Sequence, residues 1–279
     1  EEELQAVQKE IAECNAKISE NERELERLQK ELREKQEKLK IGQTAYHRES
    51  SRLESLKNIT ERYDGYGNSI RKVMEQKDKN PGILGVVADL IKVKSSYETA
   101  IETALGGSIQ NIVTDNEQTA KRMISFLKKN RYGRATSLPL SNISGRGGLA
   151  QKDVLREPGV VGTANTLVEA DAEYSELVMY LLGRVLVVDN IDHAIAIGKK
   201  YRHSLRMVTI EGESLSPGGS MTGGAFKNNS NLLGRRREIE ELERSVGILK
   251  KELEETQRAI GENRSRRNVL RDTIADFQQ

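Results

Sequence analysis

A seven-residue repeat of apolar side chains at both ends of the chain constrains its fold more than any other feature. From Leu4, apolar residues recur at alternating steps of three and four, and the repeat returns between Ile239 and Phe277. Apolar residues at two positions in seven, with Glu, Lys and Arg at the others, are typical of coiled-coil helices. Both helices leave one middle region, so they can run back antiparallel and bury their seams on each other. The pattern therefore predicts a coiled-coil arm that carries a compact domain.

The seam positions also predict the register of the two helices. Opposed layers place Leu53 near Leu242. They also place Leu25 near Leu270, within about one heptad. Three polar residues interrupt the seams in the middle of the arm: Lys35, Asn263 and Arg267. We expect looser pairing around these three residues.

Composition agrees with an arm and a modest globule. Of the 279 residues 32% are charged, only 4% are aromatic and none is Trp, which suits helices that bury few positions. The formal net charge of +2 means that any nucleic-acid site must be local. The single cysteine, Cys14, excludes a disulfide within the chain and suits a reducing compartment. The sequence shows no signal peptide and no apolar run of membrane-spanning length. Because the heptad pattern is in phase at both ends of the chain, we expect the chain to be a piece of longer arms.

The middle region alternates strand-like and helical patterns in an order that occurs twice. Leu105-Gly106 followed by Asp115-Asn116 is echoed by Leu182-Gly183 followed by Asp189-Asn190. Each Asp-Asn follows a β-rich run and opens a helix, where a side-chain oxygen can cap free N–H groups. We predict an α/β (α+β mixed-sheet) domain of two similar subdomains. The expected organisation is an N-terminal arm over 1–63, a first subdomain over 64–140, a linker over 141–158, a second subdomain over 159–233 and a C-terminal arm over 234–279.

The densest local signal is the glycine-rich segment 216–224. A phosphate-binding loop would need Gly-Lys-Ser/Thr between a strand and a helix, and neither the motif nor that context is present. A flexible linker is the simplest alternative. Paired glycines around a small Ser-Met-Thr core also suit a backbone that another chain approaches closely, which is the interpretation we favour.

No motif predicts catalysis or metal binding. His47, His193 and His203 have no metal-ligand spacing with each other or with the cysteine. Asp115 and Asp189 could be imagined as paired carboxylates, but each has a capping role available. The sequence lacks a Gly-x-Ser-x-Gly elbow, and the absence of Cys-x-x-Cys excludes a zinc-hook tip.

Basic residues cluster at a few places, and the most suggestive cluster lies where the globule meets the second arm. There Arg235, Arg236 and Arg237 precede a run of glutamates. Further basic residues occur at Lys227, Arg71-Lys72, Lys128-Lys129-Asn130-Arg131 and Lys199-Lys200-Tyr201-Arg202-His203. A solvated helix face is the ordinary explanation for any one cluster, whereas converging clusters can neutralise phosphates without reading sequence.

Together these residues resemble the hinge of the SMC (structural maintenance of chromosomes) family with flanking arm segments, most like a bacterial SMC. The resemblance covers essentially the whole chain. It rests on Gly82-Ile83-Leu84-Gly85 with Ala88-Asp89-Leu90-Ile91, on Ala104-Leu105-Gly106, and on Pro217 through Gly224.

The resemblance implies a homodimer in which each subdomain meets the opposite type on its partner, with Gly218, Gly219, Gly223 and Gly224 at the contact. It implies weak, sequence-independent DNA binding by Arg71, Lys72, Lys227, Arg235, Arg236 and Arg237. It also implies ATPase heads with ATP and Mg at the far arm ends, kleisin-type and accessory subunits for the full-length protein, and a nucleoid-associated cytoplasmic location without membrane contact. This chain itself would hold no cofactor, no metal and no catalytic residue. The alternative function is a ligand- or nucleotide-binding α/β domain on a coiled-coil stalk, which micromolar ligand binding would favour.

Overall fold

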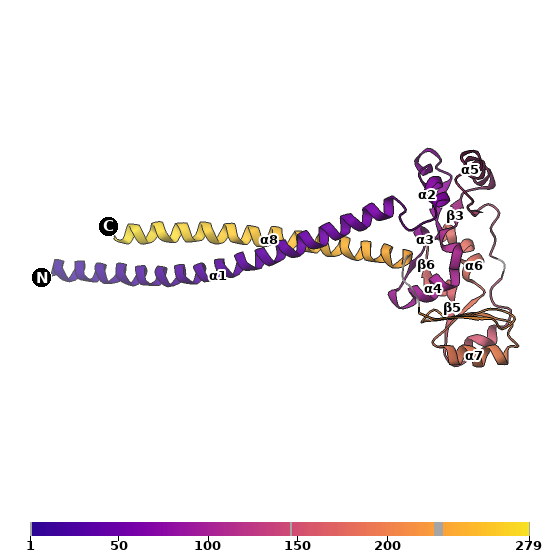
Figure 1. Ribbon diagram of the computed structural model, residues 1–279. Coiled ribbons are helices and arrows are strands. Elements are labelled where there is room, and N and C mark those ends of the chain that lie inside the picture. The colour runs from indigo at the N-terminus through magenta and orange to yellow at the C-terminus, as the bar shows by residue number, and fades with distance from the viewer. Residues whose placement is uncertain (1, 146, 226–230, 279) are drawn as a thin grey trace. The chain divides into compact units, whose positions relative to one another are not determined.

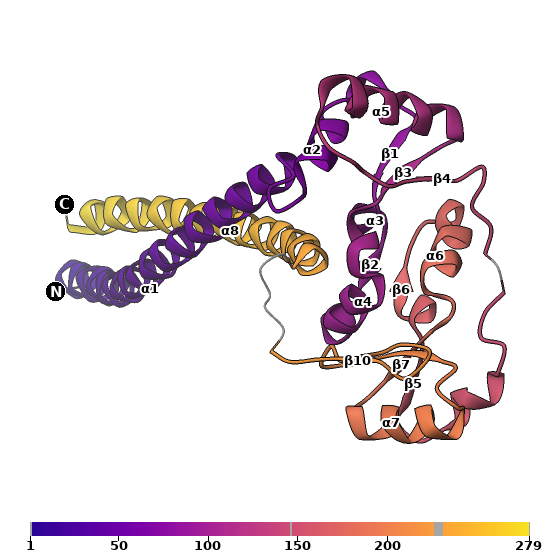
Figure 2. The same cartoon turned by 45° about the vertical axis from the view of Figure 1, so that its right-hand side comes forward.

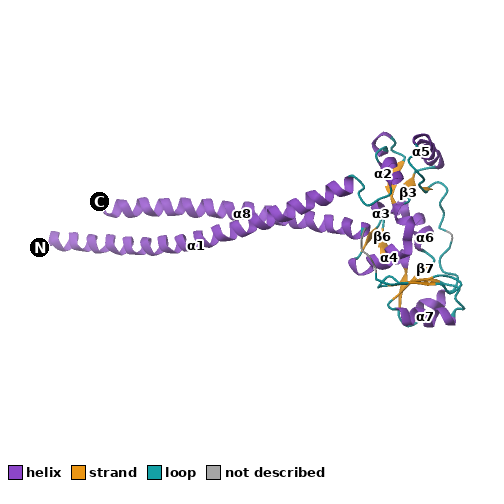
Figure 3. Cartoon of the chain, in the orientation of Figure 1, coloured by secondary structure: helices purple, strands orange, loops and turns teal. Residues whose placement is uncertain are grey.

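The computed structural model describes residues 2–145, 147–225 and 231–278, which form two compact units. One unit contains residues 1–55 and 241–279, and the other runs from Leu56 to Glu240. Two long helices, α1 (Glu2–Glu61) and α8 (Leu232–Gln278), make up the first unit and contribute their inner ends to the second (Figure 1). Among the described residues, strands occur only in the stretch of sequence between α1 and α8 (Figure 3).

The two arm helices pack against each other in antiparallel orientation, as predicted. Ser245 Oγ donates to the Glu49 carboxylate, whereas Arg266, farther along α8, lies 2.8 Å from the carboxylate of Glu24, farther back on α1. The backbone of Gly42 faces Leu253, since a Cβ at Gly42 would lie 3.0 Å from Leu253 Cδ2. Gly42 precedes Leu53 by as many residues as Leu253 follows Leu242. In an antiparallel pair of helices, this contact therefore has the register predicted for Leu53 and Leu242.

Asn263, one of the polar residues where we expect looser pairing, is buried in the seam. This side chain is only 6% exposed, and it lies in the same buried part of the arm as Leu28 and Ile260. Its Nδ2 donates to the Leu28 carbonyl oxygen at 3.1 Å, whereas its Oδ1 is buried without a partner among the described residues. The contact falls about one helical turn from the predicted register, within the stated error.

The unit Leu56–Glu240 contains two halves with similar element orders. The first half consists of α2 (Asn68–Met74), β1 (Ile83–Val86), α3 (Val87–Leu90), β2 (Lys92–Val93), α4 (Glu98–Leu105), β3 (Ile112–Thr114), α5 (Glu117–Asn130) and β4 (Ser137–Pro139). The second consists of β5 (Val160–Thr163), β6 (Val168–Glu169), α6 (Ser175–Leu182), β7 (Val185–Val188), α7 (Ile191–Lys200), β8 (Arg206–Thr209), β9 (Ser214–Leu215) and β10 (Met221–Thr222). Short 3-10 turns occur at Lys77–Lys79, Ser95–Tyr97, Gly106–Gln110, Lys152–Arg156, Ala164–Leu167 and Ala172–Tyr174.

The repeat seen in the sequence is a repeat of sheet topology. In the first half β1 pairs antiparallel with β3, which pairs parallel with β4; in the second, β5, β7 and β8 repeat this arrangement. Both antiparallel pairs contain an irregularity at equivalent glycines, Gly85 and Gly162, whose φ angles are +151° and +154°. The mixed α/β fold with two similar subdomains is thereby confirmed. The second sheet continues through β9 to β10 and has the order β10-β9-β8-β7-β5.

The two halves share one hydrophobic cluster, which the sequence did not suggest, and a second cluster lies wholly between Leu149 and Leu215. β2 pairs with β6 across the halves, opposing Lys92 to Glu169. One hydrophobic cluster takes buried residues from both halves, and Arg206 of β8 donates to the Ala104 carbonyl of α4 at 2.8 Å. Figure 2 shows α4 and α6 between the two halves, with α5 on one side and α7 on the other. Because this cluster is shared, each half depends on the other for part of its apolar burial, whereas Leu186, Val188 and Met207 of the second half belong to the other cluster.

The predicted helix caps are present in both halves. The Asn116 side chain accepts from the backbone N–H groups of Gln118 and Thr119, each at 3.0 Å. Its counterpart Asn190 accepts from His193 N at 2.9 Å. These side chains satisfy the first N–H groups of α5 and α7, which have no partner within the helix.

Candidate functional site

The glycine-rich segment forms a hairpin at the edge of the second sheet. Gly218 and Gly219, in the turn between β9 and β10, have φ angles of +91° and +95°, and Gly224 has +128°. Residues with a Cβ seldom adopt such angles, so the hairpin itself requires glycine at these three positions. Gly223 differs, because a Cβ there would meet Glu213 Cγ at 3.1 Å.

The outer side of this hairpin is open within the described chain. β10 is the last strand of its sheet, and Met221 and Thr222 are both exposed, Met221 by 50%. A Cβ built on Gly218 or Gly224 meets no described atom of the chain within 4 Å. An edge strand with free backbone groups and an exposed Met is a ready surface for pairing with another chain.

The start of α8 is fastened into the core of the unit. Leu232 and Leu233 are 5% and 4% exposed, and Leu233 N donates to the Glu102 carboxylate at 3.3 Å. This contact places a negative charge at the positive end of the helix. Burial is the main cause that raises the pKa of Glu102.

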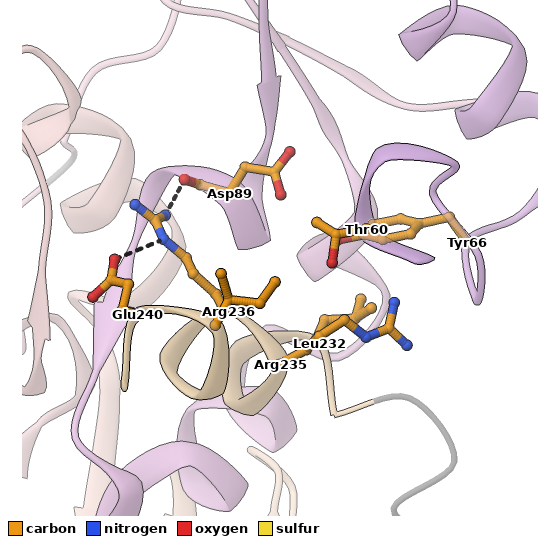
Figure 4. Close-up of a pocket in the computed structure, with 8 residues that line it drawn as sticks. Thr60, Tyr66, Asp89, Leu232, Arg235, Arg236 and Glu240 are labelled. Atoms are coloured by element: carbon orange, nitrogen blue, oxygen red, sulfur yellow. Dashed lines mark hydrogen bonds and ion pairs between the residues drawn. The ribbon is translucent and has the colours of Figure 1, made fainter. Parts of the chain in front are cut away.

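The three consecutive arginines continue this attachment. Arg235 Nη1 donates to the Asp64 carbonyl oxygen at 2.8 Å. Arg236 Nη1 donates to the carbonyl oxygens of Asp89 and of Ile91, the latter at 3.2 Å. Figure 4 shows the Arg236 side chain pointing at Asp89 and Glu240.

Arg237 forms the strongest of these contacts. Its Nε lies 2.5 Å from Glu98 Oε1, and the Glu98 side chain is only 9% exposed. Arg236 also lies 3.8 Å from the carboxylate of Glu240, one turn farther along α8. Each arginine thus stabilises the junction between α8 and the rest of its unit.

Asp89 connects the inner ends of both long helices. Tyr63, which follows α1 with a left-handed φ of +51°, donates through its hydroxyl to Asp89 Oδ2 at 3.1 Å. The Asp89 carbonyl accepts from Arg236 of α8. Burial raises the pKa of the Asp89 carboxyl, and burial followed by the Asp89 charge raises the pKa values of Tyr63 and Tyr66. Sequence reasoning noted Asp89 only within a family motif, because nothing in its local pattern reports these contacts.

A cavity of about 280 Å³ lies at this junction, lined by Thr60, Tyr66, Asp89, Leu232, Arg235, Arg236, Ile239 and Glu240 (Figure 4). Its wall is mainly apolar, and both guanidinium groups already have carbonyl partners. These features do not resemble a phosphate cradle.

The remaining predicted basic residues are distributed unevenly. Arg71 Nη1 lies 3.9 Å from Asp64 Oδ1, so Arg71 and Arg235 approach the same residue. Lys72 instead pairs with Glu75 at 3.0 Å. Lys227 lies outside the described residues.

The residues considered for catalysis and metal binding do not assemble into such a site. Asp115 and Asp189 occupy equivalent positions in different halves, and Asp189 lies 2.7 Å from His193 Nδ1. A hydrogen bond from Thr119 is the largest cause that lowers the pKa of Asp115. Among the described residues no group of three His, Cys, Asp or Glu side chains could hold a metal ion. None of the described helices is both long and apolar enough to cross a membrane.

Comparisons with known proteins agree with this geometry. Residues 80–198 match the family model described as the SMC proteins flexible hinge domain. The chromosome partition protein Smc of Bacillus subtilis is 39% identical over 221 residues, which cover 75% of this chain and 18% of that protein. The same protein of Lactiplantibacillus plantarum is 39% identical over 209 residues, covering 74% and 18% respectively. The chain thus spans about a fifth of the length of these relatives.

Solved structures extend the match to the fold. A crystal structure of an asymmetric dimer of the Geobacillus stearothermophilus SMC hinge domain superposes with a TM-score of 0.78 at 35% identity, covering 86% of this chain and 97% of that one. A Pyrococcus furiosus Smc hinge domain with an extended coiled coil gives a TM-score of 0.51 at 27% identity, covering 96% and 98%. The shared sheets, the flanking long helices and this level of identity place the chain in the SMC family, as a hinge domain with flanking arm segments.

Proposed function

We propose that this chain is the dimerisation module of a chromosome-organising SMC ATPase, acting in chromosome condensation and segregation. Two copies join through their hinge units, and each arm leads to an ATP- and Mg-binding head elsewhere in the protein. Kleisin-type and accessory subunits then complete a nucleoid-associated assembly in the cytoplasm. The Smc relatives that support this proposal are named chromosome partition proteins, and each is several times longer than this chain.

The observation that carries the proposal is the open edge at β10. The Geobacillus hinge domain was crystallised as an asymmetric dimer, and it is similar to this chain over most of its length. In our proposal β10 and its glycines in one copy meet the first half of the other copy. Such a contact occurs twice in a closed dimer, once from each copy.

A charge placed on the edge strand tests this proposal better than alanines at the glycines. Three of the four glycines have positive φ, so alanine there would strain the hairpin even without a partner. Met221→Asp instead changes a side chain that is 50% exposed within the chain. Val161→Asp, on the opposite edge strand β5 and 36% exposed, is the matched control.

Burying the exposed half of Met221 contributes about 1 kcal/mol per contact, or about 2 kcal/mol per dimer with two contacts. Met221→Asp adds the desolvation of a carboxylate, so the dimer Kd should rise at least about 100-fold in sedimentation equilibrium. Val161→Asp should change the Kd less than about threefold. Equal dimerisation of Met221→Asp and the unsubstituted chain would exclude β10 from the contact.

We also propose weak, sequence-independent DNA binding at the arm junction. The convergence of Arg71 and Arg235 on Asp64 supports it, and the side chains of Arg236 and Arg237 keep 33% and 35% of their surface exposed. Arg71→Gln with Arg235→Gln should weaken binding of a short duplex at low salt without changing the dimer Kd. Unchanged DNA binding would assign both residues to the junction alone.

The alternative of a nucleotide-binding domain has less support. The wall of the junction cavity is mainly apolar and includes Tyr66, Leu232 and Ile239, which suits a nucleotide phosphate poorly. Micromolar nucleotide binding in isothermal titration calorimetry would reverse this preference.

A further inference from the structure

A groove of about 400 Å³ lies between the two helices of the arm, inside one compact unit. Its floor is apolar, because it is lined by Leu39 of α1, which is partly exposed, and by Ile260 of α8, which is 7% exposed. Gly261 adds no side chain to the wall, and a Cβ built there meets no described atom within 4 Å. The groove is therefore open on that side of the arm.

Amide and cationic side chains border this floor. They belong to Gln36, Lys40 and Gln43 on α1 and to Gln257 and Arg264 on α8, and all five residues are exposed. Within the described chain no carboxylate lines the groove, and neither Lys40 nor Arg264 has an ion pair. We call these five residues, with Leu39, Ile260 and Gly261, the arm groove.

A third cation lies on the same face of α8. Arg267 occupies the seam position one heptad beyond Ile260, where a polar residue interrupts the apolar pattern. Its Nε is buried and has no hydrogen-bond partner among the described residues. Because a buried charged donor without an acceptor is costly, an anionic group that reaches Arg267 would stabilise the arm.

The opposite side of the arm is held by contacts between the two helices. By heptad position, Glu24, Ser245 and Arg266 flank the seam on the side away from the groove. Arg266 lies 2.8 Å from the Glu24 carboxylate, and Ser245 donates to Glu49. Charged side chains that flank a coiled-coil seam decide which helices pair. The arm-groove residues form no such contact within the described chain, so this side presents charges without a complement.

We propose that the arm groove binds an acidic amphipathic helix of a partner protein. The apolar face of that helix would cover Leu39 and Ile260, and its carboxylates would meet Lys40, Arg264 and Arg267. With Gly42 opposite Leu253, Lys40 and Arg267 lie about 12 residues apart along the arm, or roughly 18 Å. A helix of three to four turns is long enough to reach all three cations.

A second copy of this chain fits the groove less well. In a two-fold symmetric contact the groove would face itself, so Lys40 and Arg264 would oppose like charges. DNA would neutralise the cations, but protein–DNA contacts are strongly polar and would leave the apolar floor without a partner. An acidic helix matches both the charge and the floor.

Charge reversal with a matched control tests the inference on the whole chain. Lys40→Glu with Arg264→Glu alters the groove, whereas Lys30→Glu with Arg258→Glu makes the same change at exposed positions that face away from the seam. The probe is a fluorescent peptide of about 21 residues, with Leu at two positions in seven and Glu or Ala at the others. Its binding is followed by anisotropy at about 50 mM salt, and a second peptide carries Lys in place of Glu.

Gly261→Gln tests the groove without a change of charge. The longer side chain occupies the open wall, and replacing a helical glycine favours the helix. The arm should therefore keep its unfolding midpoint in far-ultraviolet circular dichroism. This variant decides the question even if charge reversal unfolds the arm.

The Glu peptide should bind the groove charge variant at least about 10-fold more weakly than the unsubstituted chain. Gly261→Gln should weaken binding at least about threefold, and the control variant should stay within about twofold. Failure of the Glu peptide to bind the unsubstituted chain, equal binding to all variants or equal binding of the Lys peptide would overturn the inference. A rise in the dimer Kd of the groove variant with unchanged peptide binding would instead assign the groove to a second copy. Duplex DNA binding that is lost with the groove charges, without binding of the Glu peptide, would replace the helix by a nucleic acid.

Discussion

Removing the charge of Arg237 should destabilise the hinge unit, because it would leave the buried Glu98 carboxylate without its partner. The two side chains lie 2.5 Å apart, with Glu98 9% exposed and Arg237 35% exposed. Breaking a fully buried pair costs roughly 3 to 5 kcal/mol. Because Arg237 is partly solvated, we expect about 2 to 3 kcal/mol for Arg237→Met.

The opposite single change should cost much less. In Glu98→Gln the Arg237 guanidinium keeps access to water, so the loss should stay near 1 kcal/mol. In the double variant no buried charge is left unpaired, and its stability should lie closer to Glu98→Gln than to Arg237→Met.

Urea unfolding followed by tyrosine fluorescence measures this effect in the relevant unit. Seven of the eight tyrosines lie between Leu56 and Glu240, whereas far-ultraviolet circular dichroism would mainly report the arm helices. With a slope of about 2 to 3 kcal/mol per molar urea, the midpoint should fall by about 1 M in Arg237→Met. A fall below about 0.3 M, or a double variant no more stable than Arg237→Met, would refute the assignment of Arg237 to a stabilising ion pair.

Cysteines replacing Leu53 and Leu242, in a chain without its native cysteine, should cross-link within one molecule at high dilution, and only intermolecular products would contradict the antiparallel arm. Asp89→Asn should become the more stable protein as pH rises above about 4. Burial raises the pKa of the native carboxyl, so the folded state binds the Asp89 proton more tightly than the unfolded state does, and the native protein loses stability when Asp89 ionises. If the melting temperatures of Asp89→Asn and of the native protein change in parallel with pH, this burial has no energetic effect. Gly82→Ala should lower the free energy of unfolding in urea by about 1 to 3 kcal/mol, because the added Cβ would overlap side-chain atoms of Thr119 and Asp115. In the control Gly107→Ala the added Cβ meets no described atom within 4 Å, so the free energy of unfolding should change by less than about 0.5 kcal/mol.

Those features that depend on neighbours in the sequence could be predicted from the sequence alone. The heptad repeat predicted α1, α8 and their antiparallel pairing, because burial of two positions in seven determines which helix face is covered. Asn116 and Asn190 predicted the starts of α5 and α7, because a cap acts within three residues of itself. The twofold echo of Leu-Gly and Asp-Asn predicted two similar halves, because repeated local patterns form repeated elements.

Only the tertiary structure decided what the basic and polar residues contact. Arg237 and Glu98 are 139 residues apart, and no local period reports that a folded core brings them together. Asn263 illustrates the same limit, since the sequence does not report that its Nδ2 donates to a backbone carbonyl of the opposite helix. The pairing of β2 with β6 likewise depends on how distant segments share a hydrophobic cluster, as does the edge position of β10 within the described sheet. The energy of that shared burial is a property of the whole unit rather than of any segment.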